Sequence, residues 1–63
     1  MEKLLSVQEV AEVLAVPVPT VYRWRYEGTG PVGLKVGRHV RYDPAELRRW
    51  LAEHRDDRAP ADA

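Results

Sequence analysis

The fold of this chain is decided by residues 6–27, which read SVQEVAEVLAVPVPTVYRWRYE. Ser6 and Glu9 stand three positions apart, the spacing of a capping box in which each side chain bonds the other residue's backbone amide. The apolar residues that follow recur at the spacing of one helical face; they are Val7, Val10, Ala11 and Leu14. This pattern predicts a first helix over residues 7–14.

A second helix is expected after a short turn. Pro17 and Pro19 cannot lie inside a helix, so the chain must turn just before them. Proline is well tolerated in the first turn of a helix, and Gly28 is placed to end one. We therefore predict a second helix from Val18 or Pro19 to Glu27. Two short helices joined by three or four residues form a helix-turn-helix unit.

Helical geometry gives this second helix two faces. Val21 and Trp24 share the inward face, where packing in the core is favoured for the tryptophan over stacking on a base. Arg25 also points inward, so it must extend its charge to solvent or pair with an acid such as Glu27. The outward face is polar and aromatic, with Thr20 at its margin; it carries Tyr22, Arg23 and Tyr26.

Residues 34–42, LKVGRHVRY, alternate apolar and basic side chains, which is typical of a half-buried β-hairpin. If all the apolar residues are to face the core, Val36 must oppose Val40 across a three-residue loop. A two-residue loop would pair Val36 with His39 and is disfavoured, because it places Arg41 beside Leu34. The type of turn stays open.

A third helix is predicted over residues 44–54. Asp43 is a suitable N-cap and Pro44 a suitable first residue, and the apolar face that follows includes Leu47 and Trp50, which we expect to pack in the core. The fold class is therefore mainly α with a small β-hairpin, a winged helix-turn-helix in which the hairpin is the wing. Residues 1–54 form this single domain, and residues 55–63 are expected to be a disordered tail.

Several classes of function have no support in the 63 residues. Ser6 is the only serine, there is no cysteine, and His39 and His54 are isolated, so we predict no enzyme, no metal site and no cofactor. No apolar run approaches the length of a membrane helix, which is about 20 residues. The expected location is the cytoplasm, in association with the nucleoid.

The net charge is zero, but its distribution is uneven. Residues 20–42 carry five basic side chains and one acid, whereas the segments on either side are acidic. Such an asymmetry focuses a local positive field. It predicts double-stranded DNA as the partner, contacted by Thr20, Tyr22, Arg23 and Tyr26 on the second helix and by Lys35, Arg38, His39 and Arg41 on the hairpin. The alternative interpretations are a solvated charged helix face and basic residues that protect a sheet edge.

The arrangement resembles the excisionase-type family of small winged helix-turn-helix proteins, which is related to the DNA-binding part of MerR-type regulators. The resemblance covers roughly residues 4–52. The runs that carry it are LSVQEVA at 5–11, LAV at 14–16, TVYRW at 20–24, GRHVRY at 37–42 and LRRWL at 47–51. It departs from the family at Pro17, where a small polar cap is common, and in the glycine-rich loop of residues 28–33.

The resemblance implies that the second helix is the recognition helix and that the tip of the wing also touches DNA. It further implies a recombination directionality factor, whose DNA-bound copies bend an attachment site, associate cooperatively and steer an integrase toward excision. A transcription regulator of the same fold is the alternative. A protein-interaction adaptor that uses Tyr22 and Tyr26 as anchors, without DNA, is a third hypothesis.

Overall fold

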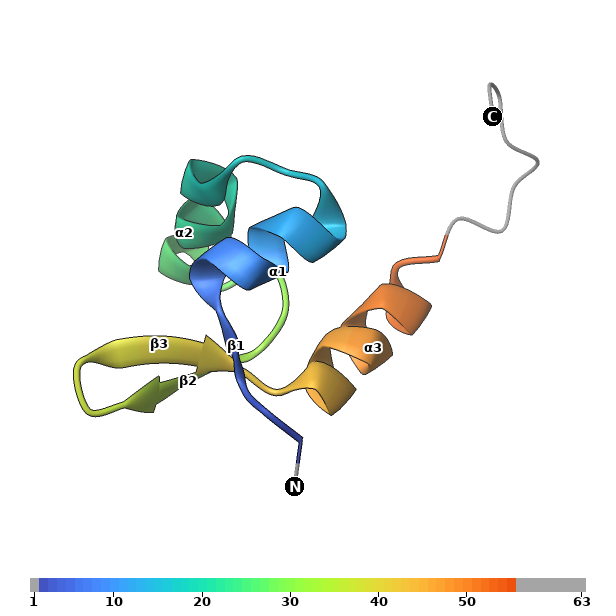
Figure 1. Ribbon diagram of the computed structural model, residues 1–63. Coiled ribbons are helices and arrows are strands. Elements are labelled where there is room, and N and C mark those ends of the chain that lie inside the picture. The colour runs from blue at the N-terminus through green and yellow to red at the C-terminus, as the bar shows by residue number, and fades with distance from the viewer. Residues whose placement is uncertain (1, 56–63) are drawn as a thin grey trace.

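A computed structural model of the protein describes residues 2–55 and contains three helices and a small antiparallel sheet (Figure 1). In chain order the elements are β1 (Leu5–Ser6), α1 (Val7–Leu14), α2 (Val18–Glu27), β2 (Gly33–Val36), β3 (His39–Tyr42) and α3 (Pro44–Glu53). The predicted winged helix-turn-helix is confirmed. The predicted tail, apart from Arg55, lies outside the described residues.

Helix α1 begins with the predicted capping box. The Ser6 amide donates a hydrogen bond to Glu9 Oε1 at 2.8 Å, and the Glu9 amide donates to Ser6 Oγ at 3.1 Å. The helix ends at Ala15, whose φ of 58° is left-handed and turns the chain toward α2. The Val16 amide then donates to the Ala11 carbonyl at 3.0 Å and closes the turn.

Helix α2 begins at Val18, after Pro17 in an extended conformation. Pro17 supplies no side-chain cap, and its carbonyl accepts a hydrogen bond from the Thr20 amide at 3.0 Å. Gly28 ends the helix with a φ of 79°, a left-handed conformation that glycine adopts without a steric penalty. The substitution of a proline for a polar cap therefore leaves the start of α2 within the predicted range.

The register of the hairpin differs from the prediction. Val36 pairs with His39 and Leu34 with Arg41, so the turn has two residues, not three. Gly37 has a φ of 64° while the φ of Arg38 is not positive, which is the sign pattern of a type II′ turn. Directly paired residues share a face, so Leu34 and Val36 lie with His39 and Arg41, away from the buried Tyr42.

A third strand, β1, was not predicted. It pairs antiparallel with β3, with Leu5 opposite Tyr42 and Ser6 opposite Arg41, and gives the strand order β1-β3-β2. A strand of two residues is too short to produce an alternating pattern. Ser6 is at once the last residue of β1 and the N-cap of α1, so the sheet passes directly into the helix-turn-helix.

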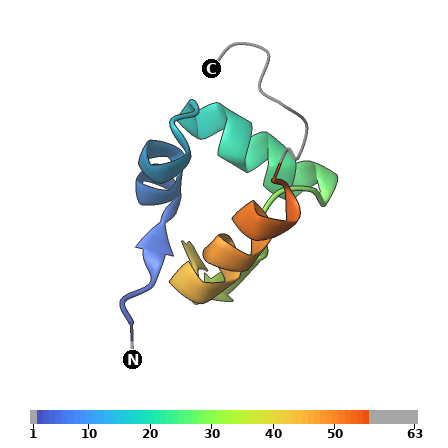
Figure 2. The ribbon, with the colours of Figure 1, turned by 90° about the vertical axis from the view of Figure 1, so that its right-hand side faces the viewer.

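The core lies where the helices and the sheet meet. Figure 2 shows α1 and α2 on one side of it and α3 across from them. The buried apolar side chains are Val7, Val10, Ala11, Val21, Tyr42 and Leu47. Tyr42 is only 1% exposed, and burial raises the pKa of its hydroxyl. Trp24 and Trp50 are half-buried, and their ring centroids lie 5.6 Å apart, so the predicted core packing takes the form of a mutual contact.

The glycine-rich loop between α2 and β2 is held against Trp24. The Thr29 amide donates a hydrogen bond to the Trp24 carbonyl at 2.8 Å. Gly30 follows with a φ of 77°, and a Cβ atom placed on it would lie 2.8 Å from the Cβ of Trp24. The loop therefore requires glycine at this position for both conformation and space.

Candidate nucleic-acid interface

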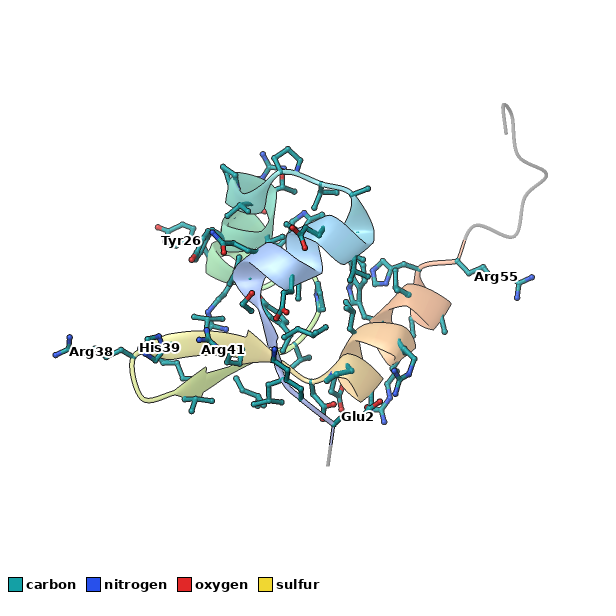
Figure 3. The ribbon with its side chains drawn as sticks, viewed as in Figure 1. Glu2, Tyr26, Arg38, His39, Arg41 and Arg55 are labelled. Carbon is teal, nitrogen blue, oxygen red and sulfur yellow. The ribbon has the colours of Figure 1, made fainter. Side chains whose placement is uncertain are left out.

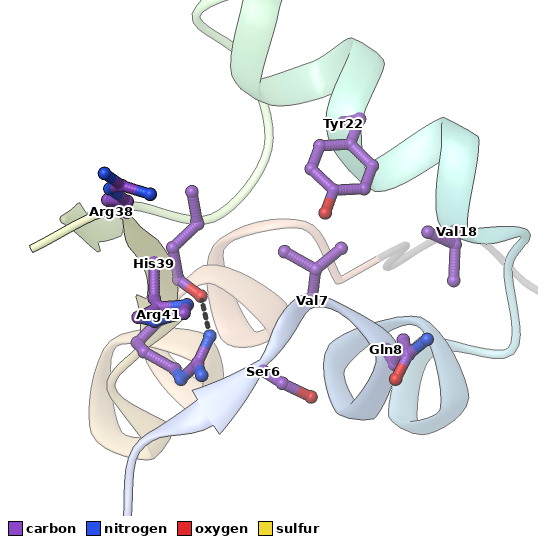
Figure 4. A pocket seen from close by; sticks show the side chains of 9 residues that line it. Ser6, Val7, Gln8, Val18, Tyr22, Arg38, His39 and Arg41 are labelled. Carbon is purple, nitrogen blue, oxygen red and sulfur yellow. Dashed lines mark hydrogen bonds between the residues drawn. The ribbon is translucent and has the colours of Figure 1, made fainter. Parts of the chain in front are cut away.

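A groove of about 590 Å³ separates α2 from the wing. Its walls come from the junction of β1 and α1, from α2, and from β3 with the turn before it. The groove is lined by Ser6, Val7, Gln8, Val18, Tyr22, Arg38, His39, Val40 and Arg41. Figure 4 shows Tyr22 on one side with its hydroxyl toward the start of α1, and the wing residues on the other side. The groove thus joins the outward face of α2 to the base and tip of the hairpin.

The wing contributes the positive charge of this groove. Arg41 is half-buried at the base of the wing, and its Nη1 donates a hydrogen bond to the Val40 carbonyl at 2.8 Å. Arg38 and His39 lie exposed at the tip, with Arg38 extending away from the body of the protein (Figure 3). Within residues 2–55, neither arginine forms an ion pair, so their charge is available to an anionic partner.

Glu9 is an acid whose pKa is affected by the charges of this region. The hydrogen bond from the Ser6 amide has the largest effect and lowers the pKa of Glu9; burial opposes it, and the charges of Lys3 and Arg41 lower the pKa by smaller amounts. Its carboxylate is already engaged by the capping box. Glu9 therefore stabilises the start of α1.

The outward face of α2 presents the predicted recognition residues. Tyr22 is 54% exposed and Tyr26 is 92% exposed, and Arg23 between them is exposed as well. Thr20 is half-buried at the start of the helix. Arg23 has no ion-pair partner among the residues that the structure describes. This face is free to approach a ligand along most of the length of α2.

The structure brings four of the eight predicted residues to one groove, namely Tyr22, Arg38, His39 and Arg41. Thr20, Arg23 and Tyr26 lie along α2 outside the groove lining. Lys35 pairs with Val40, so it occupies the other face of the hairpin from His39 and Arg41. Lys35 is therefore separated from the other wing cations, which the predicted register did not anticipate.

Arg25 extends its charge to solvent, as predicted, and the two arginines of α3 also lie on the surface. Arg25 is exposed and makes no ion pair in the described part of the chain; its Nη1 lies near Gly33, and its charge acts on the Tyr42 hydroxyl. Arg48 and Arg49 are solvated and form ion pairs with Glu2 at 3.1 Å and with Glu46 at 3.4 Å. All three arginines are peripheral to the groove.

Sequence reasoning did not find the contribution of α1 to the groove. Ser6, Val7 and Gln8 line it, but no pattern in the sequence places the start of α1 beside the wing. The capping box at Ser6 and Glu9 was the one relevant signal in the sequence, because it marks the start of a helix, where the first backbone amides have no partner within the helix. Gln8 follows directly and is exposed, with an amide that can donate and accept hydrogen bonds.

This geometry suits double-stranded DNA. An exposed α-helix fits the major groove, where arginine, tyrosine and threonine can reach base edges and phosphates. A hairpin with arginines at its tip and base can follow the adjacent phosphate backbone or enter the minor groove. No helix within residues 2–55 combines the length and the apolar character needed to cross a membrane.

Comparison with known proteins agrees with the geometry. Residues 4–55 match the protein family described as the helix-turn-helix domain, which covers α1, α2, the wing and α3. No curated protein and no solved structure has significant similarity to the chain. The family is one of DNA-binding domains, which are typically not enzymes. The chain therefore belongs to the helix-turn-helix domain family and is a small DNA-binding protein.

Proposed function

We propose that this protein is an excisionase, which binds specific sites in attachment-site DNA, bends the duplex and directs an integrase toward excision. The observation that carries the proposal is the groove in which Tyr22 of the recognition helix faces Arg38, His39 and Arg41 of the wing. The helix-turn-helix domain family includes excisionase-like proteins, and the resemblance to excisionases extends over residues 4–52.

In the proposed complex, α2 enters the major groove with Arg23 and Tyr26 toward the bases. Arginine can donate two parallel hydrogen bonds to guanine O6 and N7, which makes Arg23 the main candidate for reading sequence. Arg38 and Arg41 then contact phosphates beside the wing, which fix the register without reading bases. Tyr22 and His39 lie between these two sets of contacts.

In this proposal the domain acts through the shape of the DNA and through its partners. The proposal includes several copies bound cooperatively at repeated sites and a contact with the integrase on the resulting complex. Bending is favoured when a protein holds both the major groove and the neighbouring backbone, because the bend brings more protein surface into contact.

Binding tests the first half of the proposal. Fluorescence anisotropy with duplex DNA from the chain's own genomic neighbourhood, at two salt concentrations, should give tight, salt-sensitive binding. A scrambled duplex of the same composition is the control and should bind much more weakly. Equal affinity for both duplexes would contradict specific recognition, and no binding at low salt would move the search to protein partners.

Recombination tests the second half and separates the excisionase from a transcription regulator with the same interface. The protein is added to a plasmid that carries candidate attachment sites from its genomic neighbourhood, together with an integrase encoded in that neighbourhood. Excision that depends on this protein supports the proposal. Specific DNA binding without any effect on excision, combined with repression of an adjacent promoter in a reporter assay, would identify a transcription regulator.

A further inference from the structure

The outer face of strand β2 carries an aliphatic row that the fold does not use. Leu34 is 43% exposed and Val36 is 48% exposed, and Val32, two residues earlier, is 63% exposed. Strand β2 is also the edge of the sheet, since the strand order is β1-β3-β2. Single exposed aliphatic residues are common on proteins, but Leu34 and Val36 stand at alternate positions of one strand and therefore share a face, which we call the aliphatic row.

The register places this row beside the proposed DNA-binding groove. Leu34 pairs with Arg41 and Val36 with His39, and directly paired residues of an antiparallel sheet project on the same side. Both Arg41 and His39 line the groove. The aliphatic row therefore continues the groove wall along the wing, and a ligand that touches these two basic residues comes next to Leu34 and Val36.

The charges around the aliphatic row determine which kind of partner can bind over it. Residues 33–42 contain Lys35, Arg38 and Arg41 together with His39, and no carboxylate. Pairing of this edge with a second copy of the chain would bring two sets of cations together, which is unfavourable. A polyanion that offers apolar surface between its charges is the complementary partner. The minor groove of DNA has this character, because its walls are deoxyribose rings flanked by phosphates.

We propose that Leu34 and Val36 contact the minor groove of bound DNA and promote its bending. The inference rests on the proposed DNA-binding function and assigns to these two residues a role that the wing cations cannot fill. Apolar side chains pressed into the minor groove widen it and bend the duplex toward the major groove. In this arrangement the arginines at the tip and base of the wing contact phosphates, while the aliphatic row lies in the minor groove between the two DNA strands.

The test separates an apolar contact from an ionic one. In the double variant Leu34→Thr/Val36→Thr, both positions keep residues that favour strands but lose most of their apolar surface. Binding to a duplex selected from a random pool by the wild-type protein should weaken about tenfold. The salt dependence of binding should stay unchanged, because no phosphate contact is lost. The bend, measured by energy transfer between dyes at the duplex ends, should fall toward that of free DNA.

Three matched variants complete the design. Val13→Thr alters an aliphatic residue that is 59% exposed outside the groove lining, and it should leave affinity and bend at wild-type values. Arg38→Ala should reduce the salt slope by about one. The conservative variant Leu34→Ile/Val36→Ile should retain the bend, and circular dichroism should show the same fold for all variants.

The outcomes distinguish this inference from the proposed function. If the wild-type protein binds no duplex, the proposed function fails and the inference fails with it. If the wild type binds and bends DNA but Leu34→Thr/Val36→Thr matches it, only the inference is overturned. It is also overturned if sedimentation shows that the free wild-type protein self-associates and that the double variant is monomeric, because the row would then join two copies.

Discussion

The indole rings of Trp24 and Trp50 meet at a centroid distance of 5.6 Å, tilted by 43°, and this contact ties α3 to the recognition helix. Tilted aromatic pairs at such distances add to the stabilisation that comes from burial alone. His54 continues the cluster, stacked on Trp50 at 4.2 Å, with its Nδ1 donating to the Trp50 carbonyl at 2.8 Å. The end of α3 is thus organised around one tryptophan.

Replacing Trp50 with alanine is expected to destabilise the whole domain. The variant loses the contact with Trp24 and the stack with His54, and a half-buried tryptophan should contribute about 2–3 kcal/mol to the free energy of unfolding. Urea denaturation followed by circular dichroism measures the change. Arg49→Ala, on the exposed side of the same helix, should stay within about 0.5 kcal/mol of the wild type. Equal stability of the two variants would contradict the role given to Trp50.

Gly30→Ala should destabilise the protein more than Gly28→Ala does. The two glycines have nearly the same φ, 77° and 79°, so the conformational penalty of alanine is similar at both. A Cβ atom at Gly30 would meet the Cβ of Trp24 at 2.8 Å, whereas nothing lies within 4 Å of one at Gly28. Thermal unfolding of both variants isolates the clash, which should add about 1–3 kcal/mol. A larger loss at Gly28 would show that the loop can move away from Trp24.

Stability should decrease in acid through the capping box. The Ser6 amide lowers the pKa of Glu9 below its ordinary value of 4.5, so the carboxylate stabilises the folded state above that pH. The stabilisation is lost as the pH falls through the lowered pKa. Glu9→Gln keeps a side-chain acceptor for the Ser6 amide but cannot titrate, so its melting temperature should decrease less in acid than that of the wild type.

The matched control is Glu12→Gln, on the same helix but without a hydrogen bond to the Ser6 amide. Its melting temperature should follow the wild-type dependence on pH. A parallel acid response of Glu9→Gln and the wild type would mean that another group causes the acid transition. In a separate measurement, Ser6→Ala should lower the free energy of unfolding by about 1 kcal/mol at neutral pH, because the Glu9 amide loses its cap.

Arg23→Ala should weaken binding to specific DNA by about 1–3 kcal/mol, since the side chain extends from the exposed face of the recognition helix without a partner in the described part of the chain. Fluorescence anisotropy measures the loss, with scrambled duplex in parallel. Arg49→Ala removes the same charge from α3, away from the groove, and should retain wild-type affinity. Unchanged affinity in Arg23→Ala would remove this residue from the recognition surface.

The helices could be predicted from the sequence because each has local signals at both ends. The capping box at Ser6 and Glu9, the prolines at 17 and 19, and Gly28 determine the limits of α1 and α2, and the structure places them within the predicted ranges. These signals act through hydrogen bonds and backbone angles within a few residues, so they do not depend on the rest of the fold.

The hairpin register could not be predicted in the same way. The prediction assumed that Leu34 and Val36 face the core. In the structure the turn at Gly37 has only two residues, and Leu34 and Val36 face outward as a result. A preference of the turn for glycine at its first position outweighed the burial of two aliphatic side chains. The same register separates Lys35 from Arg41, which is why only part of the predicted wing site lies in one groove.

The junction at Ser6 has a consequence for the thermodynamics of association. Because β1 ends at Ser6, directly before α1 begins at Val7, and pairs with β3, no loop separates the sheet from the helix-turn-helix at this junction. We therefore expect α2 and the wing, which are proposed to contact DNA, to be held in a fixed relation before any ligand arrives, with their ordering entropy already lost during folding. Calorimetry of complex formation should accordingly show a heat-capacity change that reflects surface burial alone, without the larger change that accompanies folding coupled to binding.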